Sequence, residues 1–280
     1  MSRMKRLGYG LAAALLLIPV GSHLATGGTL STSSARPPGE RPAPRAAAVR
    51  VHPTTVPRPP VGWGPPALDE DFAGDRIDLS RWAVYHDPGG THPRTRRAVS
   101  VKDGVLRLTG ARYGGRLLSG GVAAHYPQTF GRFEARMKAD PGAGYSAVML
   151  LWPTRQGEPE WAEINFAEIP DPARRTAGLF VHQGEDDDTS SKAIDGDFTR
   201  WHVFALEWFP DRMTFFIDGK IVWEHTGRNI PQKADMHLAL QNDLVCYSKE
   251  QCQGPDTPDR VTMHVDWVRI YPLPSQTSAS

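Results

Sequence analysis

The sequence predicts an all-β protein organised as an antiparallel β-sandwich, and three observations point to it. Polar and apolar residues alternate with a period of two through most of the chain, as they do around Phe133, Ala135 and Met137. This period is typical of strands with one buried face. Asp-Gly pairs at 103–104 and 218–219 mark tight hairpin turns. Beyond the N-terminal region the sequence lacks the 3.6-residue apolar stripe of crossover helices, so neighbouring strands are expected to run antiparallel.

The first residues, 1–26, are predicted to be a secretory signal peptide, and the protein is therefore expected to be secreted. Arg3, Lys5 and Arg6 form a positive start, the run Leu11–Val20 is apolar, and small residues follow, which is the layout of a cleaved signal. The apolar run is about half as long as a membrane span requires. We expect cleavage and no membrane span.

Residues 27–66 are predicted to form a disordered linker. They are rich in Pro, Ala, Ser and Arg, and such a composition cannot bury enough apolar surface to offset its conformational entropy. The linker arginines could contact an anionic cell wall, although solvated linker charge is the preferred interpretation. The remaining residues 67–274 suit one domain with a substantial core, and residues 275–280 are predicted to form a short disordered tail.

The strands of the predicted domain follow one another with short turns between them. The segment Trp201–Trp208 is long and rich in aromatic residues, and its tryptophans, together with Trp223, are expected in the core. Polar and apolar residues also alternate in a closing strand near the C-terminus. The predicted strands cover residues 105–108, 132–138, 163–168, 201–208, 212–217, 221–223 and 261–267.

Charge and cysteine content restrict the partners that the chain can have. The formal net charge of +1 gives no reason to expect a nucleic-acid partner. The only cysteines, Cys246 and Cys252, lie six positions apart in a polar loop, and in an exported protein a disulfide between them is the default expectation. A zinc site would need more Cys or His residues at ligand spacing.

One predicted strand carries the most informative pattern, Glu163-Ile164-Asn165-Phe166-Ala167-Glu168. Side chains two positions apart in a strand share a face, so Glu163 and Asn165 point the same way. Glu168 would face the opposite way unless a β-bulge near Phe166–Ala167 adds one residue and turns it back. Two carboxyl groups about 5–5.5 Å apart could then cleave a glycosidic bond with retention. The alternative is a half-solvated strand without catalytic function.

The chain resembles bacterial members of glycoside hydrolase family 16, which includes laminarinases and lichenases. No single fragment carries the resemblance, but the order and spacing of several fragments do. The matching fragments are Glu70–Phe72, Leu79–Trp82, Val101–Leu106, Tyr126–Met137, Leu150–Pro153, Glu163–Glu168, Glu207–Asp211, Phe216–Gly219 and Val265–Tyr271. The resemblance implies a concanavalin-like jelly roll and a secreted endo-glycosidase that hydrolyses β-1,3- or mixed β-1,3/1,4-glucan. It also implies a monomer that acts on a polysaccharide and needs no cofactor for its chemistry.

The family pattern E-x-D-x-x-E assigns roles to the residues of this strand. By this resemblance Glu163 is the nucleophile and Glu168 the general acid/base. Asn165 stands where the family has an aspartate that hydrogen-bonds the nucleophile. An asparagine can still donate a hydrogen bond, but it carries no charge and takes no proton. Loss of the neighbouring charge should lower the pKa of the nucleophile, so we expect slower catalysis rather than none.

Several residues near this strand are candidates for substrate binding. Sugar rings present apolar faces that stack on aromatic side chains, with polar groups between them. The candidate platforms are Tyr145, Trp152 and Trp161. The candidate polar partners are His182, which matches a family position facing the acid/base, and Gln241 and Asn242.

The resemblance also suggests a structural calcium ion on the face remote from the catalytic strand. Asp71, Asp266 and the backbone oxygen of Gly104 would supply the hard oxygen ligands that calcium prefers.

Two other functions stay open on the same fold. A non-catalytic or weakly active glycan-binding protein would share the jelly roll, and Asn165 is compatible with such drift. A pair of glutamates favours the enzyme, since a lectin does not need it. A transglycosylase would differ only in whether water or a sugar reaches the intermediate. Linkage preference depends on loops such as 88–97, whose shape the sequence does not give.

Overall fold

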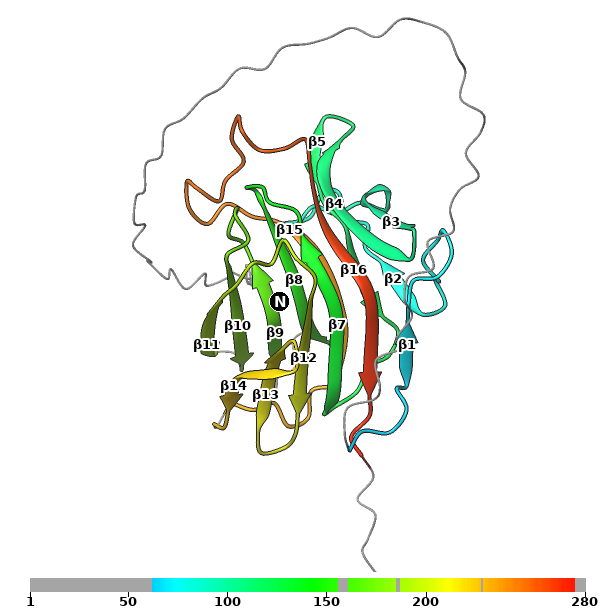
Figure 1. Ribbon diagram of the computed structural model, residues 1–280, viewed down its shortest axis with the longest axis vertical. Coiled ribbons are helices and arrows are strands. Elements are labelled where there is room, and N and C mark those ends of the chain that lie inside the picture. Colours follow the sequence, from blue (N-terminus) through cyan, green and yellow to red (C-terminus); the bar gives the residue numbers. More distant parts are fainter. Residues whose placement is uncertain (1–61, 156–160, 185–186, 228, 275–280) are drawn as a thin grey trace, which may run out of the picture. The chain divides into compact units, whose positions relative to one another are not determined.

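The computed structural model describes residues 62–155, 161–184, 187–227 and 229–274. Within these ranges the chain forms two antiparallel β-sheets and, apart from a 3₁₀ turn at Arg96–Ala98, no helix. The predicted antiparallel sandwich is therefore confirmed (Figure 1). Both sheets belong to one compact unit.

The first sheet has nine strands, and the closing strand of the chain lies near its centre. β16 (Arg260–Tyr271) pairs with β7 (Gly131–Ala139) on one side and with β4 (Val105–Tyr113) on the other. Strands far apart in sequence are thus neighbours, which is the connectivity of a jelly roll. The other strands of this sheet are β14 (Lys220–His225), β13 (Met213–Ile217), β12 (His202–Trp208), β3 (Val99–Lys102), β1 (Leu68–Glu70) and β5 (Arg116–Leu118).

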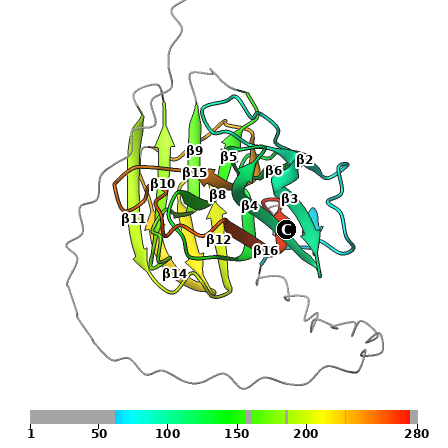
Figure 2. The same cartoon turned by 90° about the horizontal axis from the view of Figure 1, so that it is seen from above.

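The second sheet has seven strands and contains the segment singled out from the sequence. That segment is β9 (Ala162–Ile169), which lies between β10 (Thr176–Gln183) and β8 (Tyr145–Pro153). The order continues from β8 to β15 (Met236–Leu244), β6 (Gly121–Ala124) and β2 (Trp82–Val84), and β11 (Asp188–Asp195) forms the opposite edge. Seen from above, β12 and β16 lie in one layer and β9 and β15 in the other (Figure 2).

The core lies between the two sheets and is built by the predicted alternation. The inward residues of β7, Phe133, Ala135 and Met137, are fully buried, and Met149 and Leu151 of β8 belong to the same cluster. Charged residues fill the alternate positions of β7, so they face away from the core. The period of two in the sequence thus corresponds to one buried and one outer face on each strand.

The three tryptophans expected in the core have different environments. Trp208 is fully buried, and its indole N–H donates to the carbonyl of Pro231 at 3.1 Å. Trp223 is partly buried and stacks on Phe215 at 4.7 Å between ring centroids. Trp201 instead lies beneath the charged groups of Arg136 and Lys138, two outward-facing residues of β7, at 4.9 and 5.2 Å from its ring centroid. It therefore packs against the charged outer face of the first sheet.

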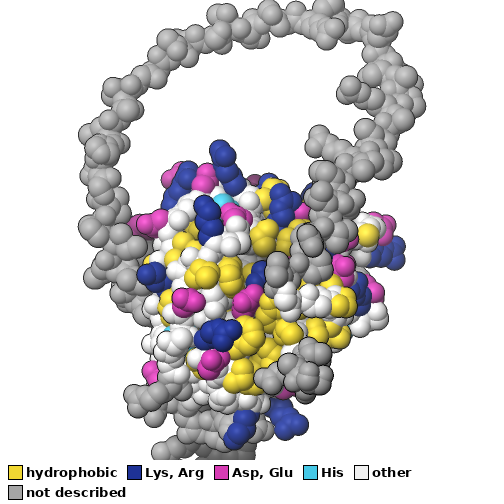
Figure 3. Space-filling model, turned by 60° about the horizontal axis from the view of Figure 1, so that its bottom comes forward, with side chains coloured by type: hydrophobic (Ala, Val, Ile, Leu, Met, Phe, Trp, Pro, Cys, Tyr) yellow, Lys and Arg dark blue, Asp and Glu magenta, His cyan; other side chains and the backbone are white. Residues whose placement is uncertain are grey.

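The packed unit begins earlier than the predicted domain boundary at residue 67. Trp63 is 9% exposed, packs against the rings of Phe209 and Tyr271, and donates its indole N–H to Glu207 at 3.0 Å. The apolar area that this tryptophan buries stabilises the segment before β1 against the first sheet. Hydrophobic side chains gather on the molecular surface shown in Figure 3.

The remaining terminal predictions lie outside the described residues. These are the signal peptide over 1–26, the linker up to residue 61 and the tail over 275–280. Within the described part of the chain, no helix is long and apolar enough to cross a membrane.

The predicted disulfide is present. Cys246 and Cys252 are bonded, with their Cα atoms 4.2 Å apart. The bond closes a loop directly after β15. The same loop is attached to the start of β8, since the amide of Gly144 donates to the carbonyl of Gln251 at 2.6 Å.

Candidate active site

A β-bulge interrupts β9 where the sequence pattern required one. Asn165 and Glu168 are three residues apart on β9, but they pair with Phe180 and Gly178, which are only two apart on β10. The same shift appears against β8, where Asn165 and Ala167 pair with adjacent residues. β9 therefore contains one extra residue between Asn165 and Glu168, and the predicted bulge at Phe166–Ala167 is confirmed.

The bulge brings both glutamates to the outer face of the second sheet. The neighbours of Glu163 in the chain, Ala162 and Ile164, belong to the buried core cluster, and so do the neighbours of Glu168, Ala167 and Ile169. Each glutamate lies between two inward-facing residues and therefore points outward. A regular strand would have directed Glu168 into the core.

An apolar strip lies beside the glutamates on the same face. Val148 and Leu150 of β8 form a small cluster with Ala239 of β15, separate from the main core, and Trp152 packs against it. The ring of Trp152 lies edge-on to Trp161, with centroids 6.1 Å apart. A cavity of about 210 Å³ lies beside Trp161 and is also lined by Arg155, Lys233, Asp235 and neighbouring residues. Two predicted platforms thus flank the glutamates.

Burial and mutual repulsion set the ionisation of the two glutamates. Burial raises the pKa of Glu168 to about 7, and the nearby charges of Glu163 and Asp243 add to this effect. Burial also raises the pKa of Glu163, whereas His182 and a hydrogen bond from Asn165 oppose that rise. The raised pKa of Glu168 favours its protonated form near neutral pH, which is the form that an acid catalyst needs.

Asn165 is held tightly in this arrangement. It is 3% exposed, and its side chain hydrogen-bonds Glu163. Its Oδ1 atom has no hydrogen-bond partner among the described residues. Because Glu163 accepts, the amide group is the donor in this pair.

His182 lies directly opposite Glu163 in the register of β10 and β9. Its Nδ1 atom is 2.8 Å from Oδ1 of Asp187 and 3.0 Å from the hydroxyl of Thr189. Its ring stacks on Phe180 with centroids 5.8 Å apart. The histidine is thus oriented from one side by a carboxylate and a hydroxyl. The resemblance had indicated a position facing Glu168, whereas the register places His182 opposite Glu163 and Gly178 opposite Glu168.

The sequence reasoning missed a polar cluster that lies toward β15. Arg94 forms an ion pair with Asp243 at 2.5 Å, donates to the side chain of Gln241, and stacks over the ring of Tyr85 at 5.3 Å. Burial raises the pKa of Tyr85 to about 12. Gln241 lies in register with Val148, which is itself in register with Glu168. Gln241, one of the predicted substrate-binding residues, therefore lies on the same outer face of the second sheet as the two glutamates.

Tyr247 is a second residue that the sequence reasoning missed. Burial raises the pKa of its hydroxyl, and the charges of Glu168, Asp243 and Glu163 add to the rise. The tyrosine lies inside the loop closed by the disulfide.

Of the two missed residues, Asp243 could have been indicated by alternation along β15, because it shares a face with Gln241. Tyr247 could not, because nothing in the sequence places the disulfide loop beside β9.

Two predicted binding residues lie on the wrong face and must be corrected. Asn242 is 1% exposed, and its amide donates to the carbonyls of Leu108 and Val261 in the first sheet, at 3.1 and 2.8 Å. Tyr145 is also 1% exposed and packs so closely on Gly110 that a Cβ there would meet its ring at 2.1 Å. Both face the other sheet, so neither is positioned to contact a sugar on the outer face.

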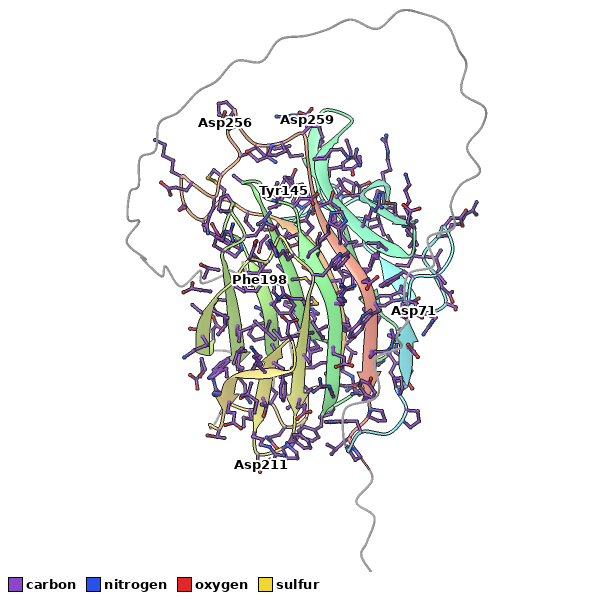
Figure 4. The ribbon with its side chains drawn as sticks, in the orientation of Figure 1. Asp71, Tyr145, Phe198, Asp211, Asp256 and Asp259 are labelled. Atoms are coloured by element: carbon purple, nitrogen blue, oxygen red, sulfur yellow. A yellow bond between two sulfur atoms is a disulfide. The ribbon has the colours of Figure 1, made fainter. Side chains whose placement is uncertain are left out.

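The calcium site suggested by resemblance is not confirmed by the structure. Asp71, on the β1 side of the molecule (Figure 4), pairs with Arg269 at 2.6 Å, and Asp266 pairs with Arg136 at 2.5 Å. Gly104 is the left-handed turn residue between β3 and β4, at φ 70°. Both carboxylates are already neutralised by guanidinium groups, and in the described ranges no three His, Cys, Asp or Glu residues gather as metal ligands.

Comparison with known proteins identifies the family. The family model described as glycosyl hydrolases family 16 matches residues 92–269. The chain belongs to glycosyl hydrolase family 16. This membership agrees with the family that the sequence fragments indicated.

Three similar proteins differ from this chain at most sequence positions. A β-glucanase from Rhodothermus marinus is 28% identical over 179 residues, and the match covers 56% of this chain and 61% of the relative. The laminarinase catalytic domain from Thermotoga petrophila RKU-1 superimposes with a TM-score of 0.64 at 18% identity, covering 75% of this chain and 98% of that one. Porphyranase B from Zobellia galactanivorans gives 0.59 at 20% identity, covering 72% and 90%. The structural likenesses show the shared jelly roll.

Proposed function

We propose that this protein is a secreted, retaining endo-glycosidase that hydrolyses β-1,3- or mixed β-1,3/1,4-glucan. The observation that carries the proposal is the bulge in β9, which directs Glu163 and Glu168 to one face. The pKa of Glu168, raised to about 7, supports its assignment as the proton donor, which leaves Glu163 as the nucleophile. Two carboxyl groups of different proton affinity are the equipment for double displacement.

In the proposed reaction Glu163 attacks the anomeric carbon while Glu168 donates its proton to the departing oxygen. The bond from the anomeric carbon to that oxygen breaks, and a glycosyl ester on Glu163 forms. Glu168, now ionised, removes a proton from water, and the resulting hydroxide equivalent attacks the anomeric carbon and releases Glu163. Both steps invert the anomeric carbon, so the product keeps the original configuration. The chemistry uses carboxyl groups alone and needs no cofactor.

Substrate binding is assigned to the strip on β8 and the polar cluster beside it. The apolar faces of glucose units would stack on Trp152 and Trp161, which lie edge to face. Gln241 and Arg94, which hydrogen-bond each other, would bond sugar hydroxyls. A β-glucanase among the curated relatives and a laminarinase among the structural neighbours favour a glucan. We further propose that the protein acts outside the cell as a monomer.

The test is a reducing-sugar assay on laminarin, lichenan, agarose and chitin, with Glu163→Gln and Glu168→Gln as controls. We expect release from laminarin or lichenan by the native protein and loss of at least about 10³-fold in Glu163→Gln, since the covalent step is removed. NMR of the first product should show the β anomer. Release of the α anomer would refute the retaining mechanism, and equal activity of the native protein and Glu163→Gln would refute the assignment of the site.

Asn165→Asp provides a second comparison. Aspartate restores the family pattern, and we expect it to increase the rate on the same glucan because it returns a proton-accepting partner to the nucleophile. If the native protein, Asn165→Asp and Glu163→Gln all bind glucan without cleaving it, the hydrolase proposal fails and the protein is a glycan-binding member of the family.

A further inference from the structure

One end of the outer face that carries the glutamates is covered by another segment of the chain. Ser146 of β8 alternates with Tyr145 and Ala147, which point into the sandwich, so its hydroxyl points outward. Ser146 is nevertheless fully buried, and its Oγ atom has no hydrogen-bond partner among the described residues. An outward-facing residue can be fully buried only where something lies over it.

The disulfide loop is the segment attached to this end of β8. Asp243, the last outward-facing residue of β15, lies in register with Ser146. Just beyond it, the amide of Val245 donates to the carbonyl of Gly144 at 3.0 Å. The amide of Gly144 in turn donates to the carbonyl of Gln251 at 2.6 Å. The loop is thus tied to β8 both before and after Tyr247, and it is placed to cover Ser146.

Tyr247 is the side chain that this loop brings to the glutamates. It is partly buried, and the charges of Glu168, Asp243 and Glu163 all act on its hydroxyl. The charge of Glu168 has the largest effect of the three. Since the interaction between charges weakens with distance, the phenol lies nearer to the acid/base than to the nucleophile.

The hydroxyl of Tyr247 is available to a ligand. Burial raises its pKa, so the phenol keeps its proton and can donate a hydrogen bond. Within the described part of the chain it has no hydrogen-bond partner. A general acid lies beside the glycosidic oxygen that it protonates. A donor next to Glu168 and farther from Glu163 therefore faces the sugar on the leaving-group side of the scissile bond.

We propose that Tyr247 contacts the sugar unit that leaves, and that the disulfide between Cys246 and Cys252 holds it in position to do so. Its hydroxyl donates a hydrogen bond to a hydroxyl group of that unit, and its ring packs against the same sugar. This inference rests on the proposed function of Glu163 and Glu168, because their roles define which sugar leaves.

The kinetic test compares substrates with and without a leaving sugar. One substrate is laminarin or lichenan, whichever the native protein cleaves faster, and the other is β-laminaribiosyl fluoride, which releases fluoride. On the glucan we expect kcat/KM to fall about thirtyfold in Tyr247→Ala and about fivefold in Tyr247→Phe, which loses only the hydrogen bond. On the fluoride both variants should stay within about twofold of the native protein, because the contact is absent from that transition state.

The role of the disulfide is tested by replacing Cys246 and Cys252 together with serine. We expect kcat/KM on the glucan to fall about tenfold, with little change on the fluoride, because the loop no longer fixes the tyrosine. Retained activity on the fluoride shows that each variant is folded. Lys249→Ala is the matched control, since Lys249 is exposed in the same loop, and it should leave both rates unchanged.

A binding measurement gives a readout that does not depend on activity. Laminarihexaose and a mixed-linkage hexasaccharide can be titrated calorimetrically into Glu163→Gln protein, with and without Tyr247→Ala. The Kd of the tighter ligand should rise about tenfold when the tyrosine is removed.

The outcomes separate failure of this inference from failure of the proposed function. Native protein inactive on all four glycans would refute the hydrolase function, and the titration would still decide whether Tyr247 contacts a glucan. In an active protein, equal losses on the glucan and the fluoride would overturn the inference alone, and so would full activity of Tyr247→Ala on the glucan. A serine variant with native rates would overturn the role of the disulfide. Glu163→Gln protein that binds neither hexasaccharide would overturn the contact.

Discussion

Replacing the proposed acid catalyst should stabilise the protein while inactivating it. The pKa of Glu168 rises from its ordinary value of 4.5 to about 7 because of burial and nearby carboxylates. Between these two values the folded state holds a proton that the unfolded chain has released. Stability is therefore lost as the pH rises from about 4.5, and the loss is complete above about 7. At about 1.36 kcal/mol per pKa unit the full loss is roughly 3 kcal/mol.

Glu168→Gln removes this cost because the amide is neutral at every pH. We expect its free energy of unfolding to exceed that of the native protein by about 1 kcal/mol at pH 5 and by about 3 kcal/mol at pH 8. For a domain of this size the difference at pH 8 corresponds to a rise of about 6–12 °C in Tm. Urea unfolding followed by tryptophan fluorescence at both pH values measures it directly.

The matched control is Glu224→Gln on the exposed face of β14, which should change stability little at either pH. The reasoning is refuted if Glu168→Gln has the same advantage at pH 5 and pH 8, or if it is less stable than the native protein at pH 8. In the first case the gain would come from packing rather than from proton binding.

Four further outcomes are expected. Hydrolysis should decline as the pH rises through about 7, because Glu168 must be protonated to release the leaving group; a profile flat from pH 6 to 9 would contradict this. Arg174→Lys should lower stability by about 3 kcal/mol in urea unfolding, since Arg174 donates to five backbone carbonyls and lysine has only three donors. Trp152→Ala should raise KM about fivefold with little change in kcat, because a stacking contact is worth about 1 kcal/mol; an unchanged KM would remove it from the site. Replacing Cys246 and Cys252 by serine should cost about 2 kcal/mol in the same unfolding assay.

The antiparallel sandwich and the faces of the residues in β9 could be predicted because they depend on local rules. Alternation with a period of two identifies the strands, and it also requires an irregularity if Glu163 and Glu168 are to share a face. The register of β9 against both neighbours contains that irregularity. In β9 the pattern of residue types was sufficient to predict which face each side chain occupies, because polar residues alternate there with apolar neighbours that must point into the core.

The binding residues were predicted less well because their faces depend on strand phase. Gln241 and Asn242 are adjacent, so only one of them can face outward in a regular strand, and the other bonds carbonyls of the opposite sheet. Tyr145 fails for the same reason, since it shares the inward phase of Met149. Tyr247 could not be found at all, because its position depends on a loop that folds back from another strand.

The bulge in β9 has a consequence for how such a protein could tolerate a deletion. Deleting Phe166 would remove the extra residue and leave Glu163, Asn165 and Glu168 at alternate positions of a regular strand, so all three would still face outward. Without the bulge, the same six residues would direct Glu168 into the core. A single-residue deletion at this point is therefore compatible with both carboxyl groups on one face.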